Sequence, residues 1–172
     1  SMFKQQKGRY IITSVLFRLT RKYSPKLDYG GVRAALGDKT SELTPGHLRE
    51  AIIKIRRQKL PDPAEIGNAG SFFKNPVMPK EQCEAIVRAE GEVPHYELQD
   101  GTVKVPAAWM IERCGFKGKR LGGAKVYEKQ PLVIVNASGE ASAQDILDLE
   151  NQIITEVKRR FGVELHPEVE HV

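Results

Sequence analysis

The chain has 172 residues, of which 40% are hydrophobic and 28% are charged. This composition predicts a folded protein with one core or two small ones, and it argues against disorder. The formal charge of +5 permits an anionic partner. However, 22 acidic residues are interspersed among 27 basic ones, which argues against a long nucleic-acid track and suits a phosphorylated small molecule equally well.

The sequence also indicates a cellular compartment. Its longest apolar runs, such as Pro131–Val135, are too short to cross a bilayer, and the start lacks the features of a signal peptide. We therefore expect no membrane association and a cytoplasmic location. Cys83 and Cys114 have no CxxC spacing, which favours free structural thiols over a disulfide or a metal pair. Ser1-Met2 resembles a cleaved-tag scar, so we expect the chain to be a fragment.

The first third of the chain is predicted to contain one strand and one helix. Arg9–Leu19 is dense in β-branched and aromatic residues without Gly or Pro, which predicts a mostly buried strand. Tyr23–Ser41 is interrupted by proline and glycines and is typical of a linker near a domain boundary. Thr44 then offers an N-cap before Pro45, and apolar residues at helical spacing predict a helix that ends at the cations near Lys59.

The remainder of the chain mixes helices with short strands. The longest predicted helix has an amphipathic stripe and a glycine directly after its end. This mixed order predicts an α+β fold with several helices and a small antiparallel sheet. Helices are predicted at Pro79–Glu90, Ala107–Cys114 and Ser142–Phe161, two strand-like pieces within Lys125–Val135, and a final extended segment from Val163.

A glycine-rich stretch, Ile66–Pro76 (IGNAGSFFKNP), places a single hydroxyl between glycines and aromatic residues. Such a turn permits positive φ and close approach of a ligand, but it lacks the spacing of a P-loop or of a dinucleotide-binding motif. Taken alone, Ser71 is more often a turn or cap residue than a catalytic one, and no His or Asp nearby in sequence completes a triad. Phe72 and Phe73 are most simply core residues.

Two other groups of polar residues leave alternatives open. His166–His171 carries imidazoles and carboxylates that suggest a metal, but a solvated terminal strand is the simpler interpretation, and we expect no metal site. Basic residues gather at two places, and each group could hold a diphosphate or form a solvated face. The two groups are Arg56, Arg57 and Lys59, and Lys117, Lys119 and Arg120.

Three motifs resemble one known family. The stretch Lys59–Pro79 (KLPDPAEIGNAGSFFKNPVMP) resembles the signature of the UDP-N-acetylenolpyruvoylglucosamine reductases, flavoenzymes of peptidoglycan synthesis. Ala107–Asn136 and Phe161–Val172 are similar to the C-terminal domain and the terminal catalytic strand of that family, in the same order. The resemblance covers essentially the whole chain and implies a peptidoglycan-producing bacterium as its source.

The resemblance implies a reaction with two halves. NADPH reduces FAD, and the reduced flavin transfers hydride to the enolpyruvyl double bond of UDP-N-acetylglucosamine enolpyruvate while an acid protonates the adjacent carbon. By resemblance, Ser71 is this proton donor and Glu168 stabilises or relays at the intermediate. The same comparison implies that most of the FAD site, and a catalytic arginine, lie upstream of this chain. Residues 1–40 would then be a remnant of the flavin-binding domain with its linker, 41–160 the substrate-binding domain, and 161–172 the terminal strand.

The resemblance also implies a set of substrate-binding residues around the UDP group and its diphosphate. The loop at residues 5–8 is short and has no tyrosine where family members carry a substrate-gating one. A non-catalytic basic module that binds nucleic acid or protein is the alternative, although no aromatic-basic motif favours it. The substrate-binding residues implied are Arg56, Lys59, Asn75, Tyr96, Lys104 and Gln130.

Overall fold

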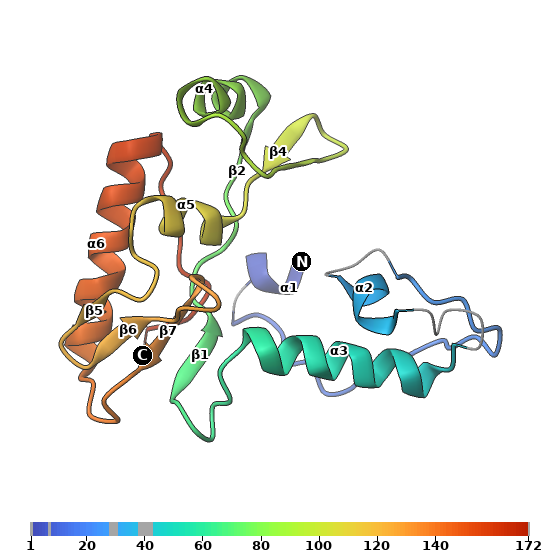
Figure 1. The fold of residues 1–172 in the computed structure, drawn as a ribbon. Coiled ribbons are helices and arrows are strands. Elements are labelled where there is room, and N and C mark those ends of the chain that lie inside the picture. Colours follow the sequence, from blue (N-terminus) through green and yellow to red (C-terminus); the bar gives the residue numbers. More distant parts are fainter. Residues whose placement is uncertain (1, 7, 28–30, 38–42, 172) are drawn as a thin grey trace. The chain divides into compact units, whose positions relative to one another are not determined.

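The computed structural model describes residues 2–6, 8–27, 31–37 and 43–171. The chain divides into two compact units, Ser1–Ile52 and Ile53–Val172 (Figure 1). Parts of the predicted linker, and Lys7 of the short loop, lie outside the described residues. Within the predicted linker a short helix, α2 (Val32–Leu36), is present.

The first unit contains short helices and an extended segment. Besides α2 it holds α1 (Met2–Gln5) and the first half of α3 (Pro45–Lys59), which continues into the second unit. The predicted N-cap is confirmed, because Thr44 Oγ1 accepts a hydrogen bond from the backbone N–H of His47 at 3.2 Å. The basic last turn of α3 is confirmed as well, where cations complement the helix dipole.

The strand predicted at Arg9–Leu19 is wrong. The segment has no strand pairing, and its apolar side chains are exposed to solvent, with Ile11 at 91% and Leu16 at 99%. A β-branched segment becomes a strand only when a neighbouring strand accepts and donates its backbone hydrogen bonds. None of the described residues supplies that neighbour, so propensity alone does not produce a strand here.

The second unit contains two small antiparallel sheets. The larger has the order β1 (Asn68–Ser71), β7 (Val133–Asn136), β6 (Ala124–Val126) and β5 (Arg120–Leu121). The smaller has the order β2 (Val77–Pro79), β4 (Thr102–Lys104) and β3 (Tyr96–Glu97). Strands β6 and β7 confirm the two predicted pieces, whereas the other strands span two to four residues and carry too little periodicity to be recognised.

Three helices of the second unit confirm the three helices predicted there, whereas the final segment forms a single bridge, Phe73–Pro167, and no strand among its described residues. They are α4 (Lys80–Glu90), α5 (Ala107–Arg113) and α6 (Ala143–Phe161). Ser142 and Asp145 form a capping box at the start of α6, and Gly162 ends it in the left-handed conformation. Helix α6 packs along β5, β6 and α5 (Figure 1). The chain is therefore an α+β protein, as predicted.

The core of the second unit is formed by residues of α4, α5, α6 and both sheets. Leu149, Ile153 and Val157 form the apolar stripe of α6 and are fully buried. Phe72 and Phe73 belong to the same core cluster, which confirms their predicted place. The residues that follow Ser71 therefore anchor β1 in the core, while Ser71 itself stays exposed.

Candidate functional site

Ser71, the predicted proton donor, ends β1 at the edge of the larger sheet. Its backbone pairs with Val133 of β7, while Asn68 pairs with Val135. The step from Asn68 to Ser71 is thus one residue longer than the step on β7, which makes a β-bulge just before the hydroxyl. The bulge sets the direction in which Ser71 leaves the sheet.

Gly70 and Asn68 build this bulge. Gly70 has φ +74°, a conformation that glycine adopts without steric strain. Asn68 Oδ1 accepts a hydrogen bond from Gly70 N at 3.0 Å, and Asn68 Nδ2 donates to the Ile66 carbonyl at 2.8 Å. A Cβ placed on Gly70 would meet nothing within 4 Å, so the outer side of the turn is open to a ligand.

Glu168, the predicted catalytic carboxylate, lies beside this turn. Its backbone N–H donates to the Phe72 carbonyl at 2.8 Å, and Lys74 N donates to the His166 carbonyl at 2.9 Å. Phe73 and Pro167 form an antiparallel bridge between these two bonds. The structure therefore brings Glu168 and Ser71, which are 97 positions apart in sequence, to neighbouring places on paired backbone segments.

Gln130 lies at the same end of the larger sheet. Its carbonyl accepts a hydrogen bond from Val133 N at 3.0 Å, and Val133 is the residue opposite Ser71. Leu132, next to it, accepts a hydrogen bond from Phe72 N at 2.8 Å. The connection between β6 and β7 thus places Gln130 near Ser71, although the two are far apart in sequence.

Asn75 has a structural partner that the sequence did not reveal. Its Oδ1 accepts a hydrogen bond from the backbone N–H of Ala107 at 2.9 Å, at the start of α5. The α5 N-cap position, Pro106, has no side chain that can do this, so Asn75 satisfies a helix donor from 32 positions away. A contact between Asn75 and a substrate stays a prediction, and the amide nitrogen is the group that would make it.

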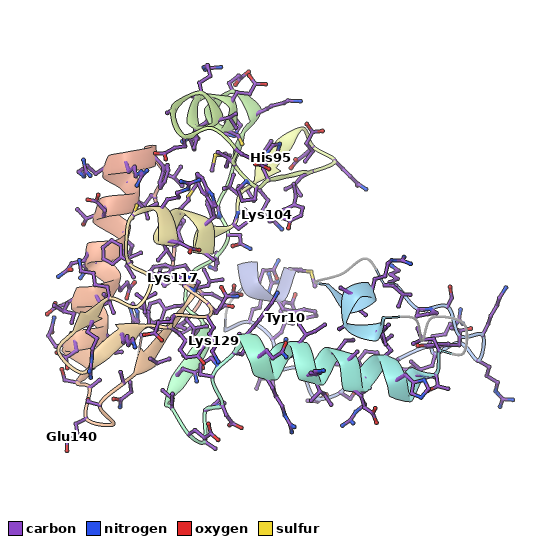
Figure 2. The ribbon with its side chains drawn as sticks, viewed as in Figure 1. Tyr10, His95, Lys104, Lys117, Lys129 and Glu140 are labelled. Atoms are coloured by element: carbon purple, nitrogen blue, oxygen red, sulfur yellow. The ribbon has the colours of Figure 1, made fainter. Side chains whose placement is uncertain are left out.

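Tyr96 and Lys104 are brought together on the smaller sheet. They lie directly opposite each other in the pairing of β3 with β4, and Val77 of β2 lies on the other side of Lys104. Tyr96 is exposed at 64% and Lys104 is half-buried. Figure 2 shows Lys104 on β4 with His95 close by, just before β3. A phenol and an ammonium group are therefore paired on one exposed sheet.

Arg56 lines a groove of about 970 Å³ beside β1. The groove also contains Arg57, the start of β1 and the connection between β6 and β7. Three basic residues, Arg56, Arg57 and Lys129, line the groove together with the acidic residues Asp62 and Glu65, so its charge is mixed. Lys59 is exposed and is not among the residues that line the groove.

Two side chains of this groove and one buried charge were not predicted from the sequence. Tyr127 and Lys129, from the connection between β6 and β7, line the groove. The only sign of them in the sequence was an aromatic residue and a lysine within the stretch where strands were predicted. Glu150 is buried at 5% exposure on α6. Its position directly after Leu149 of the apolar stripe was a usable signal, because a carboxylate rarely faces a core without a partner.

The two thiols are free, as predicted, and their environments disfavour nucleophilic chemistry. Burial raises the pKa of Cys114 to about 11 and also raises the pKa of Cys83. A thiol is nucleophilic as its thiolate, which these raised values make scarce near neutral pH. No role in catalysis follows for either cysteine.

Metal clusters and membrane-spanning helices are both absent from the part of the chain that the structure describes. Three or more His, Cys, Asp or Glu side chains placed to hold a metal ion do not occur among those residues. No helix within the described ranges is both long and apolar enough to span a membrane.

Comparison with known proteins points to one family. Residues 62–172 match the sequence profile of the C-terminal domain of UDP-N-acetylenolpyruvoylglucosamine reductase. The chain is 43% identical over 173 residues to the enzyme of that name from Bacteroides fragilis, covering 100% of this chain and 52% of the relative. It is 47% identical to the Burkholderia multivorans enzyme, covering 98% and 49%. The chain spans about half the length of the curated relatives it matches.

Proposed function

The chain belongs to the UDP-N-acetylenolpyruvoylglucosamine reductase family, and from this premise we propose that it is the substrate-binding, C-terminal part of such a reductase. The complete enzyme would reduce UDP-N-acetylglucosamine enolpyruvate to UDP-N-acetylmuramate, a peptidoglycan precursor, with NADPH as the hydride donor and FAD as the cofactor. One observation supports the proposal most directly: the Glu168 N–H donates to the Phe72 carbonyl, so the backbone of Glu168 lies next to the Ser71 turn.

The open turn at Gly70 is consistent with a flat cofactor above Ser71. A Cβ on Gly70 would meet nothing within 4 Å, and the residue before the donor therefore leaves room for a ring system. When bound, the flavin would supply the hydride that one alkene carbon receives. We assign no residue of this chain to the nucleotide part of FAD, and we expect most of that site in an upstream segment.

Within this scheme Ser71 supplies the proton. Hydride arrival at one alkene carbon leaves an enolate-like carboxylate, and the Ser71 hydroxyl protonates the adjacent carbon to complete the reduction. An alcohol is a weak acid, so the site must stabilise the negative charge that develops on the serine oxygen. Glu168 takes part in stabilising the intermediate or relaying the proton, from its place across the Phe73–Pro167 bridge.

The remaining residues would orient the UDP-sugar. Tyr96 and Lys104, paired on the smaller sheet, provide an aromatic face and a cation for the nucleotide and its diphosphate. Gln130, which lies near Ser71, and Asn75 would contribute amide groups to the sugar. Arg56 and Lys59 add positive charge at the end of α3.

The alternative, a basic module that binds nucleic acid or protein, is disfavoured by local neutralisation of the cations. Basic side chains of the second unit repeatedly contact carboxylates, which leaves less free positive charge than the sequence suggests. The pairs are Lys80–Glu97, Lys117–Glu112, Lys125–Glu128, Lys158–Glu164, Arg159–Glu156 and Arg160–Glu90.

Separate measurement of the two half-reactions tests the role of Ser71. In the complete enzyme, Ser71→Ala should leave flavin reduction by NADPH intact and slow reoxidation by the enolpyruvyl substrate by about 10²–10⁴-fold, the usual range for general acid catalysis. Ser71→Cys should restore part of the rate because a thiol can also donate a proton. Stopped-flow absorbance of the flavin follows both steps.

A matched control is Ser138→Ala, which removes a hydroxyl from a turn serine whose Oγ accepts a hydrogen bond from Glu140 N. This variant should keep both half-reactions. Normal hydride transfer to substrate by Ser71→Ala would contradict the acid role. Parallel loss of both half-reactions would instead indicate that Ser71 only shapes the turn.

Binding by the 172-residue chain tests its assignment as the substrate-binding part. We expect the purified chain to be colourless, to oxidise no NADPH, and to bind UDP-N-acetylglucosamine weakly. Chemical-shift changes should centre on Arg56, Lys59, Tyr96 and Lys104. Salt-dependent binding to arbitrary oligonucleotides without any response to UDP-sugars would support the alternative, and a flavin absorbance spectrum would contradict our placement of the FAD site.

A further inference from the structure

Glu150 is the charged side chain that the described part of the chain buries most completely. It lies on α6 beside Leu149, and its side chain is 6% exposed. Its Oε2 lies 3.0 Å from Nε2 of His171, which is 48% exposed. No hydrogen bond of acceptable geometry reaches Oε2 from the described residues, so this contact, an ion pair when His171 is protonated, is the interaction that the structure gives this oxygen.

Because the Glu150 carboxylate is buried, its ionised form depends on where its imidazole partner lies. Burial raises the pKa of Glu150, and the His171 imidazole beside it opposes this effect. Removing His171 would leave a buried carboxylate without compensation, whereas removing Glu150 would leave a half-exposed imidazole that water can solvate. The pair therefore favours keeping the last residues of the chain against α6.

His171 follows Glu168 by three positions, and both contact Phe72. The Phe72 carbonyl accepts the Glu168 N–H at 2.8 Å, and the Phe72 ring lies 6.4 Å from the His171 ring, centroid to centroid. Upstream of Glu168, Lys74 N donates to the His166 carbonyl. Glu168 thus lies between two attachments of the tail, and the downstream one is the ion pair with Glu150.

We propose that the Glu150–His171 ion pair is a positioning clamp that holds the terminal segment in register with Phe72 and thereby keeps Glu168 beside Ser71. An effect of this clamp on catalysis rests on the function proposed above, whereas its effect on the position of Glu168 does not. Neither Glu150 nor His171 needs to touch the substrate. Each acts through the backbone bond between Glu168 and Phe72.

Amide hydrogen exchange of the 172-residue chain tests the clamp directly. In Glu150→Gln and in His171→Ala, the Glu168 N–H should exchange about fivefold faster, because the end of the tail opens more often. The Phe72 N–H, which donates to the Leu132 carbonyl within the sheet, should exchange at its original rate. Asp148→Asn, which removes an exposed charge from the same helix, is the matched control and should change neither amide.

A double variant separates positioning from the loss of a charge. Glu150→Leu combined with His171→Phe replaces the ion pair by two apolar side chains, a change that buried pairs often tolerate. We expect it to restore slow exchange at Glu168. Unchanged exchange at Glu168 in both single variants would overturn the clamp. So would exchange in the double variant that is as fast as in the singles. If His171→Ala does not fold, Glu150→Gln and the double variant decide.

The half-reactions of the complete enzyme test the catalytic consequence. Glu150→Gln should slow reoxidation by the enolpyruvyl substrate severalfold, leave flavin reduction by NADPH unchanged, and regain rate in the double variant. A normal reoxidation rate together with faster exchange at Glu168 would refute the catalytic role of the clamp. Absence of reoxidation in the unmodified enzyme would instead refute the proposed function, while the exchange measurement would still decide the clamp.

Discussion

Two segments of this chain are rich in apolar β-branched residues, but only one of them forms a buried strand. Val133–Asn136 becomes β7, with β1 on one side and β6 on the other, and its three valine and isoleucine side chains are buried. Arg9–Leu19 has the same kind of residues, yet Leu16 is 99% exposed and Leu19 is 85% exposed. The difference is the availability of hydrogen-bonding neighbours, since a central strand needs two and the first unit provides none among its described residues.

Large-to-small substitutions should show the widest contrast between the units. Ile153→Ala removes a fully buried side chain from the stripe of α6 and should lower the free energy of unfolding by about 2–5 kcal/mol. Leu16→Ala in the exposed segment should change it by less than about 0.5 kcal/mol. Urea denaturation followed by circular dichroism measures both. Equal losses would mean that Leu16 is buried in solution.

Gly123→Ala should have the next largest effect. A Cβ at this position would lie 2.5 Å from the Ala141 Cα and 2.8 Å from its nitrogen, so backbone must shift. Overpacking of this kind typically lowers stability by about 1–3 kcal/mol. Gly31→Ala in the first unit, where a Cβ would meet nothing within 4 Å, isolates the effect of a positive φ from that of crowding. A smaller loss of stability in Gly123→Ala than in Gly31→Ala would contradict the close approach of Gly123 to the Ala141 backbone.

Acid should destabilise the second unit selectively. The hydrogen bond from Arg160 holds the pKa of Glu90 below its ordinary value of 4.5, and backbone donors from Ser142 and Gly123 do the same for Asp145, ordinarily 3.8. A carboxyl with a lowered pKa stabilises the folded state above its ordinary pKa, and the contribution is lost as pH falls through the folded value.

The measurement is urea denaturation at a series of pH values from neutral to below 5, with Glu90→Gln beside the unmodified chain. The stability advantage of the unmodified chain should be largest near neutral pH and should shrink as pH falls. The contribution of Glu150 to stability has the opposite pH dependence. Burial raises the pKa of Glu150, so ionisation of this group as pH rises disfavours the folded state. An advantage of the unmodified chain that grows on acidification would contradict the Arg160–Glu90 contact.

Deletion of residues 1–43 should have the smallest effect. The core cluster of the second unit contains no residue before Phe72, and Thr44 would still cap α3. We expect the thermal midpoint of the second unit to shift by less than about 4 °C, the equivalent of roughly 0.5–1 kcal/mol for a domain of this size. Loss of a cooperative transition would show that the first unit supports the second.

Sequence reasoning predicted the features that depend on local periodicity. The apolar stripe from Leu149 to Phe161 and the glycine directly after it, Gly162, placed α6 correctly, because both signals lie within the helix or at its end. The strand at Arg9–Leu19 failed because strand formation depends on partners elsewhere in the chain. For the same reason, the two-residue strands β3 and β5 could not be recognised from their own residues.

In the candidate site, too, the sequence indicated individual residues but not the contacts between distant segments. A motif resemblance singled out Ser71 and Glu168, and only the fold could show that the Phe72 carbonyl joins their segments. The cap that Asn75 provides for α5 also spans distant positions, so no spacing rule indicates it. The Glu150–His171 pair required knowledge of which face of α6 the C-terminus covers.

The bulge at Gly70 makes the number of residues in this turn important for the direction of the Ser71 side chain. A bulge bends its strand and increases the local twist, so deleting one residue from 69–70 would restore a regular pairing with β7 and leave Ser71 opposite Val133 on a straighter strand. Substitutions elsewhere in the turn keep the extra residue and therefore keep the bend. Redesign of the turn therefore has freedom in composition but none in residue number, since an in-frame deletion there would leave a folded chain whose hydroxyl leaves the sheet in another direction.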